Sequence, residues 1–242
     1  MHNLLYELKF DKYDKHYLLI ILKEDGWHIT MNNFKYIFFD LDGTLIDTVP
    51  LILDSFNYTF NYHFGETRPE EETISYIGMP LINHLRDIYP GHEEELAKTY
   101  RDYNDKRHDS CIGVFIGIFE TIKILYEKGI VMGVVTSKRR ELAIRGLKIF
   151  NLDQFFIFVN GSEDSKKHKP DGDPLIVAMN RAGATNKDEV LYVGDSPLDI
   201  LCAKNAGVKS AAVAWTYSQR SDLEKVEPDI FLECPADIFK YV

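Results

Sequence analysis

Between residues 118 and 214, short apolar runs alternate with stretches of helical character, and this alternation limits the fold more than any other feature. The apolar runs are rich in β-branched and aromatic residues, which is typical of buried strands. Strands that alternate with helices form a parallel sheet with helices on both faces. The sequence therefore predicts an α/β fold with a Rossmann-like, doubly wound parallel sheet. Ligands of such sheets bind at the carboxyl ends of the strands.

The expected elements can be given by their residue ranges. Strands are expected at 36–39, 130–135, 155–159, 190–193 and 209–214. Helices are expected between them at 118–128, 139–150, 173–182 and 198–206. A further helical stretch, 50–110, is divided by Gly and Pro residues into helices at about 50–65, 70–77, 81–89 and 93–108.

Two carboxylates, Asp40 and Asp42, stand at the end of the first expected strand, and Gly43 and Thr44 follow them. Because side chains alternate along a strand, both acids would leave it on one face. Asp-Gly is also a common turn signal, so a turn that merely carries acids is the plainer interpretation. Unpaired buried carboxylates are costly, however, and a divalent cation with its preference for oxygen ligands is their natural partner.

Polar residues also follow the later strands. After residues 130–135 come Thr136 and Ser137, where a hydroxyl and the next amide can hold a phosphoryl oxygen. A Ser or Thr at such a place is more often only a helix cap. Lys169 ends the basic run 166–169, and basic clusters of this kind are usually solvated loops.

The last of these groups follows residues 190–193. Gly194 permits a close backbone approach, and Asp195 comes directly after it. Asp199 lies four residues further, in the first turn of the expected helix and therefore near Asp195. An acid at a helix N-terminus is also favourable with the helix dipole alone.

Taken in order, the four groups resemble the motifs of the haloacid dehalogenase (HAD) superfamily over roughly residues 34–235. Those motifs are Asp-x-Asp-Gly-Thr, a Thr or Ser after a strand, Lys-Pro, and Gly-Asp-x-x-x-Asp. The chain departs from the third motif, because Gly172 stands where a proline is usual, and we expect a looser loop there. The resemblance implies a core domain, 34–49 and 111–242, and a small helical C1-type cap domain, 50–110.

The resemblance also implies a mechanism. Asp40 would be the nucleophile that forms an aspartyl-phosphate, and Asp42 the general acid and then base. Thr136 and Lys169 would bind the transferred group. Asp40, Asp195 and the backbone carbonyl of Asp42 would hold Mg²⁺. The residues implied to support this site are Thr44, Ser137, Gly194 and Asp199.

Haloacid dehalogenases lack the second acid of the first motif, so Asp42 favours hydrolysis of a phosphoester or phosphoanhydride. Asn-Ala-Gly at 205–207 and Val-Ala-Trp-Thr at 213–216 resemble the phosphoglycolate phosphatase and bacterial pyrophosphatase branch. We therefore expect a phosphatase that acts on a small phosphorylated metabolite, phosphoglycolate-like, or on inorganic pyrophosphate. Two alternatives remain open: a phosphomutase like β-phosphoglucomutase, which shares all four motifs, and a non-catalytic binding protein with the HAD fold.

Composition excludes some partners. The net charge is −10, from 28 basic and 38 acidic residues, which argues against a broad nucleic-acid-binding surface. Three scattered cysteines lack metal-type spacing and indicate reduced thiols in a cytoplasmic protein. The apolar run 17–22 is too short to span a membrane. The pattern does not determine the oligomeric state.

Residues 1–33 allow two interpretations. The runs 6–10 and 17–22 could form a hairpin in an N-terminal extension that packs on the core edge. Alternatively, Met31, just before the first motif, is the true start, and we favour this interpretation. We assign this segment no function.

Overall fold

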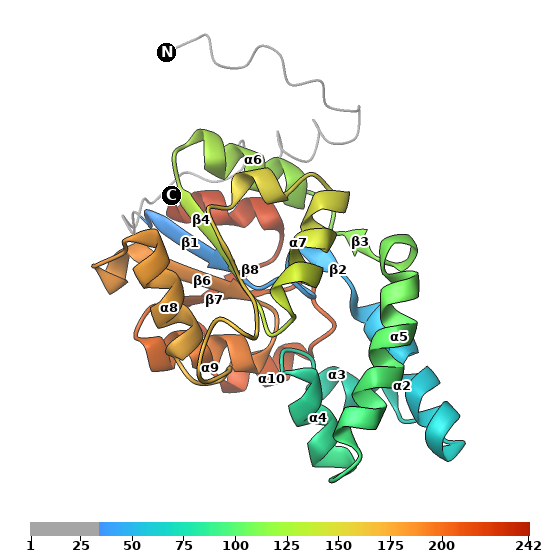
Figure 1. Ribbon diagram of the computed structural model, residues 1–242. Coiled ribbons are helices and arrows are strands. Elements are labelled where there is room, and N and C mark those ends of the chain that lie inside the picture. Colours follow the sequence, from blue (N-terminus) through green and yellow to red (C-terminus); the bar gives the residue numbers. More distant parts are fainter. Residues whose placement is uncertain (1–33) are drawn as a thin grey trace, which may run out of the picture.

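The computed structural model describes residues 34–242, so the possible hairpin and the alternative start at Met31 lie outside the described part. Its main feature is a six-stranded sheet in the order β5-β4-β1-β6-β7-β8, in which every neighbouring pair is parallel (Figure 1). The strands are β1 (Tyr36–Phe39), β4 (Val131–Val135), β5 (Val159–Asn160), β6 (Val190–Gly194), β7 (Lys209–Val213) and β8 (Ile230–Leu232). This confirms the expected doubly wound α/β fold.

Helices cover both faces of the sheet. They are α6 (Ile118–Glu127), α7 (Arg140–Ile149), α8 (Asp173–Ala182), α9 (Pro197–Ala206) and the short α10 (Arg220–Lys225). Ile37 and Phe39 of β1 belong to the hydrophobic cluster that α6 and α7 cover. Phe38 belongs to the opposite cluster, under α8 and α9. Successive side chains of β1 thus enter two different hydrophobic cores. Because both faces of the strand are buried, its sequence is a continuous apolar run.

The register of the sheet places the site. β1 lies between β4 and β6, with Phe39 opposite Val134 on one side and Val193 on the other. The residues that follow these three strands therefore come together at one edge. From β1 the chain first adds β4 and β5 on one side of the sheet and then β6, β7 and β8 on the other. Doubly wound sheets bind ligands at this kind of switch point.

Four helices form a separate unit to one side of the sheet, which we call the helical insert, residues 49–111 (Figure 1). They are α2 (Val49–Phe64), α3 (Glu70–Ser75), α4 (Leu81–Ile88) and α5 (Glu93–Cys111). Phe56, Phe60, Leu85 and Leu96 form the centre of their own hydrophobic cluster. The two-residue strands β2 (Ile46–Asp47) and β3 (Gly113–Val114) pair antiparallel where the chain enters and leaves the insert.

The strand expected at 155–159 begins later than predicted. A 3₁₀ turn, Asp153–Phe155, occupies its start. The backbone N of Ile157 donates to the Met132 carbonyl of β4, and the Phe158 carbonyl accepts from Val134 N, but the regular strand covers only Val159 and Asn160. Phe155 and Phe156 pack into the cluster beneath α6 and α7 from a loop, so burial does not require pairing there. The sequence did not predict strands β2, β3 and β8 or helix α10.

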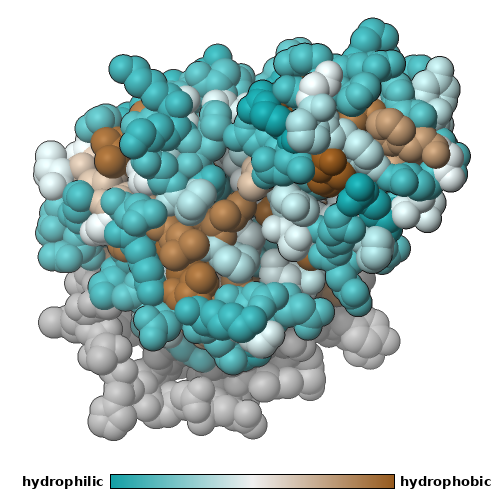
Figure 2. All heavy atoms as spheres, turned by 90° about the horizontal axis from the view of Figure 1, so that it is seen from below, coloured by the Kyte–Doolittle hydropathy of each residue, from teal (hydrophilic) through white to brown (hydrophobic). Residues whose placement is uncertain are grey.

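The surface is mainly polar. Figure 2 shows a face that is mostly hydrophilic, on which hydrophobic residues gather in separate patches. Within residues 34–242, no helix combines the length and the hydrophobicity that crossing a membrane requires.

Candidate active site

Three carboxylates meet at the sheet edge formed by β1 and β6. Asp40 follows β1, Asp195 follows β6, and Asp199 lies in the first turn of α9; each is at most 3% exposed. One oxygen from each lies within 4.8 Å of the others. So many buried acids in so small a volume need positive charge.

Lys169 supplies part of that charge. Its Nζ donates to Asp40 Oδ1 at 2.8 Å and to Asp199 Oδ1 at 2.6 Å. Burial opposes its charge, but Asp199 and Asp40 outweigh burial and raise the pKa of the ammonium group. Lys169 is therefore a permanent cation that anchors the side chain of Asp40.

One lysine does not neutralise three acids. Burial raises the pKa of Asp40 to about 7, against the attraction of Lys169 and with the help of Asp199 and Asp42. Burial and the charges of Asp199 and Asp40 also raise the pKa of Asp195 well above its usual range. A cation bound between these carboxylates would lower both pKa values, because it would favour their charged forms.

Asp195 and Asp40 offer the oxygens that could hold it. Thr44 Oγ1 donates to Asp195 Oδ1 at 3.2 Å, and Thr216 Oγ1 donates to Oδ2 at 2.9 Å. Gly43 has a φ of 83°, and a Cβ there would lie 2.3 Å from Asp195 Oδ2. The Asp195 carboxylate thus lies against the turn after Asp42. A metal site shared between this turn and the end of β6 requires such a close approach. Hard oxygen donors of this kind suit Mg²⁺.

Asp199 is already occupied by protein donors. Oδ1 accepts from Lys169 and from the Tyr192 hydroxyl at 3.1 Å, and Oδ2 accepts from the backbone N and Oγ of Ser196. Ser196 and Asp199 form a capping box at the start of α9. A Cβ on Gly194 would lie 2.4 Å from that of Asp199, so glycine is needed for this approach. Asp199 thus anchors Lys169.

Asp42 stands apart from this cluster. Its Oδ1 accepts from Thr48 Oγ1 at 2.5 Å and contacts Lys138 Nζ. It is only part-buried and faces a pocket between the core and the helical insert, which Asp40 also lines. The two acids of the first motif therefore have separate surroundings: one is enclosed and the other faces the pocket.

Thr136 and Ser137 follow β4 beside the acids. Thr136 is 6% exposed, lines the pocket with Asp40 and accepts a hydrogen bond from the Lys138 backbone N at 3.2 Å. The Ser137 hydroxyl donates to the carbonyl of Gly78, in the loop before α4. Ser137 thus joins the helical insert to the core, a contact that the local sequence did not reveal.

The loop of Lys169 is not loosened at Gly172, contrary to expectation. Asn205 Nδ2 donates to the carbonyl of Pro170 at 2.8 Å, and Cys202 Sγ donates to that of Asp171 at 3.0 Å. A Cβ on Gly172 would lie 2.6 Å from the backbone N of Ala206. The glycine therefore lets the loop pack directly against the end of α9.

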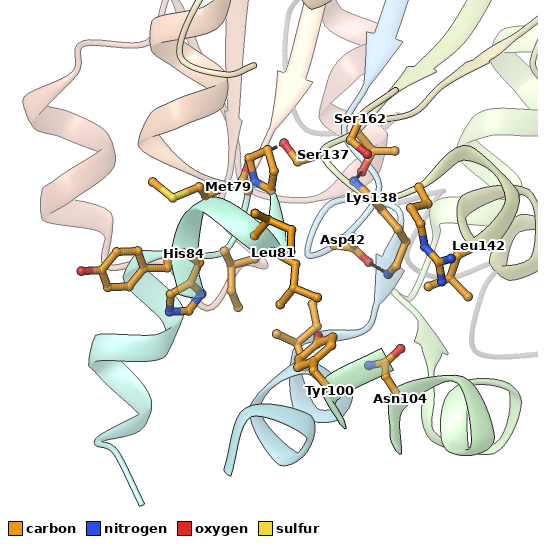
Figure 3. A pocket seen from close by; sticks show the side chains of 18 of the residues that line it. Asp42, Met79, Leu81, His84, Tyr100, Asn104, Ser137, Lys138, Leu142 and Ser162 are labelled. Atoms are coloured by element: carbon orange, nitrogen blue, oxygen red, sulfur yellow. Dashed lines mark hydrogen bonds and ion pairs between the residues drawn. The ribbon is translucent and has the colours of Figure 1, made fainter. Parts of the chain in front are cut away.

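The pocket has a mixed lining. The insert contributes mainly apolar and aromatic side chains, among them Leu81 and Tyr100, together with His84, which burial keeps neutral by lowering its pKa to about 3. Figure 3 shows Leu81 and Tyr100 on one side and Asp42 with Lys138 on the other. The pocket thus opens directly onto Asp42.

Comparisons with known proteins agree with this geometry. Residues 37–213 match the haloacid dehalogenase-like hydrolase family. The chain belongs to this family. The expected superfamily and the expectation of a hydrolytic enzyme are confirmed.

Individual relatives cover nearly the whole of the described chain. A Caldanaerobacter subterraneus protein, provisionally named pyrophosphatase PpaX, is 46% identical over 206 residues, 85% of this chain and 93% of the relative. Pyrophosphatase PpaX of Halalkalibacterium halodurans is 39% identical over 85% of this chain and 95% of its own. A solved haloacid dehalogenase-like hydrolase of Streptococcus pneumoniae, 24% identical, has a TM-score of 0.77 over 86% of this chain and 98% of its own and shows the shared fold.

Sequence reasoning missed four residues that contact the expected ones. Thr48 and Lys138 contact Asp42, while Thr216 and Tyr192 contact the buried acids. Thr48 and Thr216 lie inside stretches that resemble the family, so their hydroxyls were a usable signal. Lys138 carried none, because its partner Asp42 is 96 positions away. Tyr192 carried none, because it lies inside the apolar strand β6 and its residue type there indicates only burial.

Proposed function

We propose that this hydrolase is a Mg²⁺-dependent phosphatase that cleaves inorganic pyrophosphate through an aspartyl-phosphate on Asp40. The observation that carries the proposal is the buried Asp40, Lys169 and Asp195 beside a second acid, Asp42, at the mouth of a pocket. The two relatives named pyrophosphatase, matched over 93% and 95% of their lengths, support the choice of substrate.

In the first step, a carboxylate oxygen of Asp40 bonds to one phosphorus of pyrophosphate. The bond from that phosphorus to the bridging oxygen breaks, and its electron pair stays on the bridging oxygen, which takes a proton from Asp42. Lys169 keeps the attacking carboxylate in place. One phosphate leaves, and the other remains on Asp40.

In the second step, water attacks the phosphorus on Asp40, and Asp42 accepts its proton. The bond between that phosphorus and Asp40 breaks, so one pyrophosphate and one water become two phosphates. Asp40, Asp195 and the carbonyl of Asp42 would hold Mg²⁺, which supplies positive charge to the phosphoryl oxygens. Thr136 lines the pocket together with Asp40, which supports a role in binding the transferred group.

The proposal includes a division of the chain. Residues 34–49 and 111–242 form the catalytic core, and residues 50–110 act as a cap that shields the intermediate from water. The contact of Ser137 with Gly78 and the position of Gly78 against Ser196 support a cap seated on the core. Free Cys111, Cys202 and Cys234 support a cytoplasmic location.

A second substrate class has one observation in its favour. Leu81, Tyr100 and their neighbours give the insert side of the pocket an apolar wall, which pyrophosphate cannot use. A small organic phosphate monoester, phosphoglycolate-like, would place its organic part there. A phosphomutase would use the same pocket but return an isomeric phosphate ester.

The test is release of phosphate from pyrophosphate and from a panel of phosphate esters, with Mg²⁺ and with chelator. We expect Mg²⁺-dependent release that is fastest on pyrophosphate and falls by more than about 10³-fold in Asp40→Asn. Circular dichroism checks that the variant is folded. If wild type releases no more phosphate than Asp40→Asn on every substrate, the enzyme proposal is wrong. An isomeric ester without free phosphate would identify a mutase.

A further inference from the structure

Lys138 is a cation that the four motifs leave without a role. It follows Thr136 and Ser137, and its Nζ contacts Asp42 Oδ1. The two side chains are 12% and 13% exposed, so water screens the pair little. In Figure 3 they point toward each other at the core side of the pocket. Lys169 is bonded to the nucleophile, whereas Lys138 is bonded to the acid that meets the leaving group.

The ammonium group of Lys138 has N–H donors beyond the one that contacts Asp42. An ammonium group carries three N–H donors. Among residues 34–242, Asp42 is the only hydrogen-bond partner found for Nζ of Lys138. The remaining donors stand at the pocket that Lys138 lines together with Asp42.

Other cations of the pocket are placed differently. Arg139 is half-exposed, and its guanidinium lies 3.6 Å from Asp105 Oδ2. Arg101 also lines the pocket, from α5, but no contact joins it to Asp42 in the described structure. His84 is neutral, and the rest of the insert wall is largely apolar. Lys138 is thus the cation nearest to the point where a leaving oxygen would accept its proton.

The leaving groups of the two candidate substrate classes differ in charge. An alkyl phosphate releases an alcohol, which is neutral once Asp42 has protonated its oxygen. Pyrophosphate releases a phosphate, which still carries negative charge after the same protonation. Expelling it therefore benefits from a cation beside Asp42, whereas expelling an alcohol does not.

We propose that Lys138 is a specificity-determining residue, which binds the departing phosphate and favours phosphoanhydrides over phosphate monoesters. The inference rests on the proposed pyrophosphatase function. While substrate is absent, the ammonium group holds Asp42. Once pyrophosphate is bound, the remaining N–H groups of Lys138 donate to the oxygens of the leaving phosphate. Asp42 keeps its contact with Lys138.

The test compares kcat/KM for pyrophosphate and for glycerol 2-phosphate, an ester with an uncharged leaving group. Lys138→Met keeps a long, unbranched side chain but removes its charge. We expect it to lower kcat/KM on the order of 10²-fold for pyrophosphate and less than about 3-fold for the ester. Lys138→Arg should recover most of the pyrophosphate activity. Arg139→Met, which removes the adjacent cation, is the matched control and should leave the ratio of the two constants unchanged.

Retained activity on the ester shows that the variant is folded. Equal losses on both substrates would mean that Lys138 only positions Asp42, and no loss on either would mean that it is a surface contact; both results overturn the inference. The proposed function fails separately, when wild type itself does not cleave pyrophosphate. A loss in Arg139→Met equal to that in Lys138→Met would assign the effect to general positive charge and also overturn the inference.

Discussion

Replacing the nucleophile should stabilise the metal-free protein at neutral and alkaline pH. Asp40 is 3% exposed, and burial and two nearby acids raise its pKa from 3.8 to about 7. Between these two values the folded state binds more protons than the unfolded state, so stability is lost as pH rises through this window. Asp40→Asn resembles the protonated acid and should escape that loss.

The size of the effect follows from the two pKa values. Their difference, 7 minus 3.8, at about 1.36 kcal/mol per pH unit gives about 4 kcal/mol as the upper end. We expect Asp40→Asn to match wild type near pH 3.5 and to exceed it by about 2–4 kcal/mol in free energy of unfolding above pH 7. The variant would be inactive and more stable, because function and stability make opposite demands on the same buried charge.

Urea unfolding at a series of pH values, with chelator, measures this difference. Asp87→Asn, at an exposed acid, is the matched control and should show no pH-dependent gain. Adding Mg²⁺ at pH 8 should stabilise wild type more than Asp40→Asn, since the variant lacks one ligand. If Asp40→Asn is less stable than wild type at pH 8 in chelator, or its gain is the same at pH 4 and pH 8, the account of the buried acids is wrong.

Three further substitutions test the surroundings of the site. Gly172→Ala should lower the melting temperature and activity together, because its Cβ would lie 2.6 Å from the backbone N of Ala206; unchanged melting would contradict this. Thr216→Val removes a donor to Asp195, so the Mg²⁺ concentration for half activation should rise about 10-fold, and an unchanged titration would refute the contact. Tyr192→Phe removes a buried hydroxyl whose single hydrogen is shared between the Val135 carbonyl and Asp199 Oδ1, and should cost about 1–3 kcal/mol in urea unfolding, while kcat changes less than about 10-fold; a larger fall in kcat without lost stability would assign the hydroxyl to catalysis.

The strands that carry the motifs were predictable because their signal is local. β1 is apolar at every position since both of its faces are buried, and the acids follow it directly in sequence. The start of the strand expected at 155–159 was mispredicted, because burial also makes loop residues apolar. Phe155 and Phe156 are apolar because they pack against a core, and apolar character alone does not distinguish a strand from a buried loop.

The sequence by itself determined the order of the main strands and helices, the family, and the acids, hydroxyls and lysine that the four motifs place at strand ends. These follow from neighbouring residues, whose spacing controls backbone conformation and side-chain direction. Only the tertiary structure decided which of them touch: Lys169 holds Asp40 and Asp199, and Lys138 meets Asp42 across 96 positions of the chain. Contacts between such distant residues depend on strand order, register and the packing of the insert, and no local pattern records them.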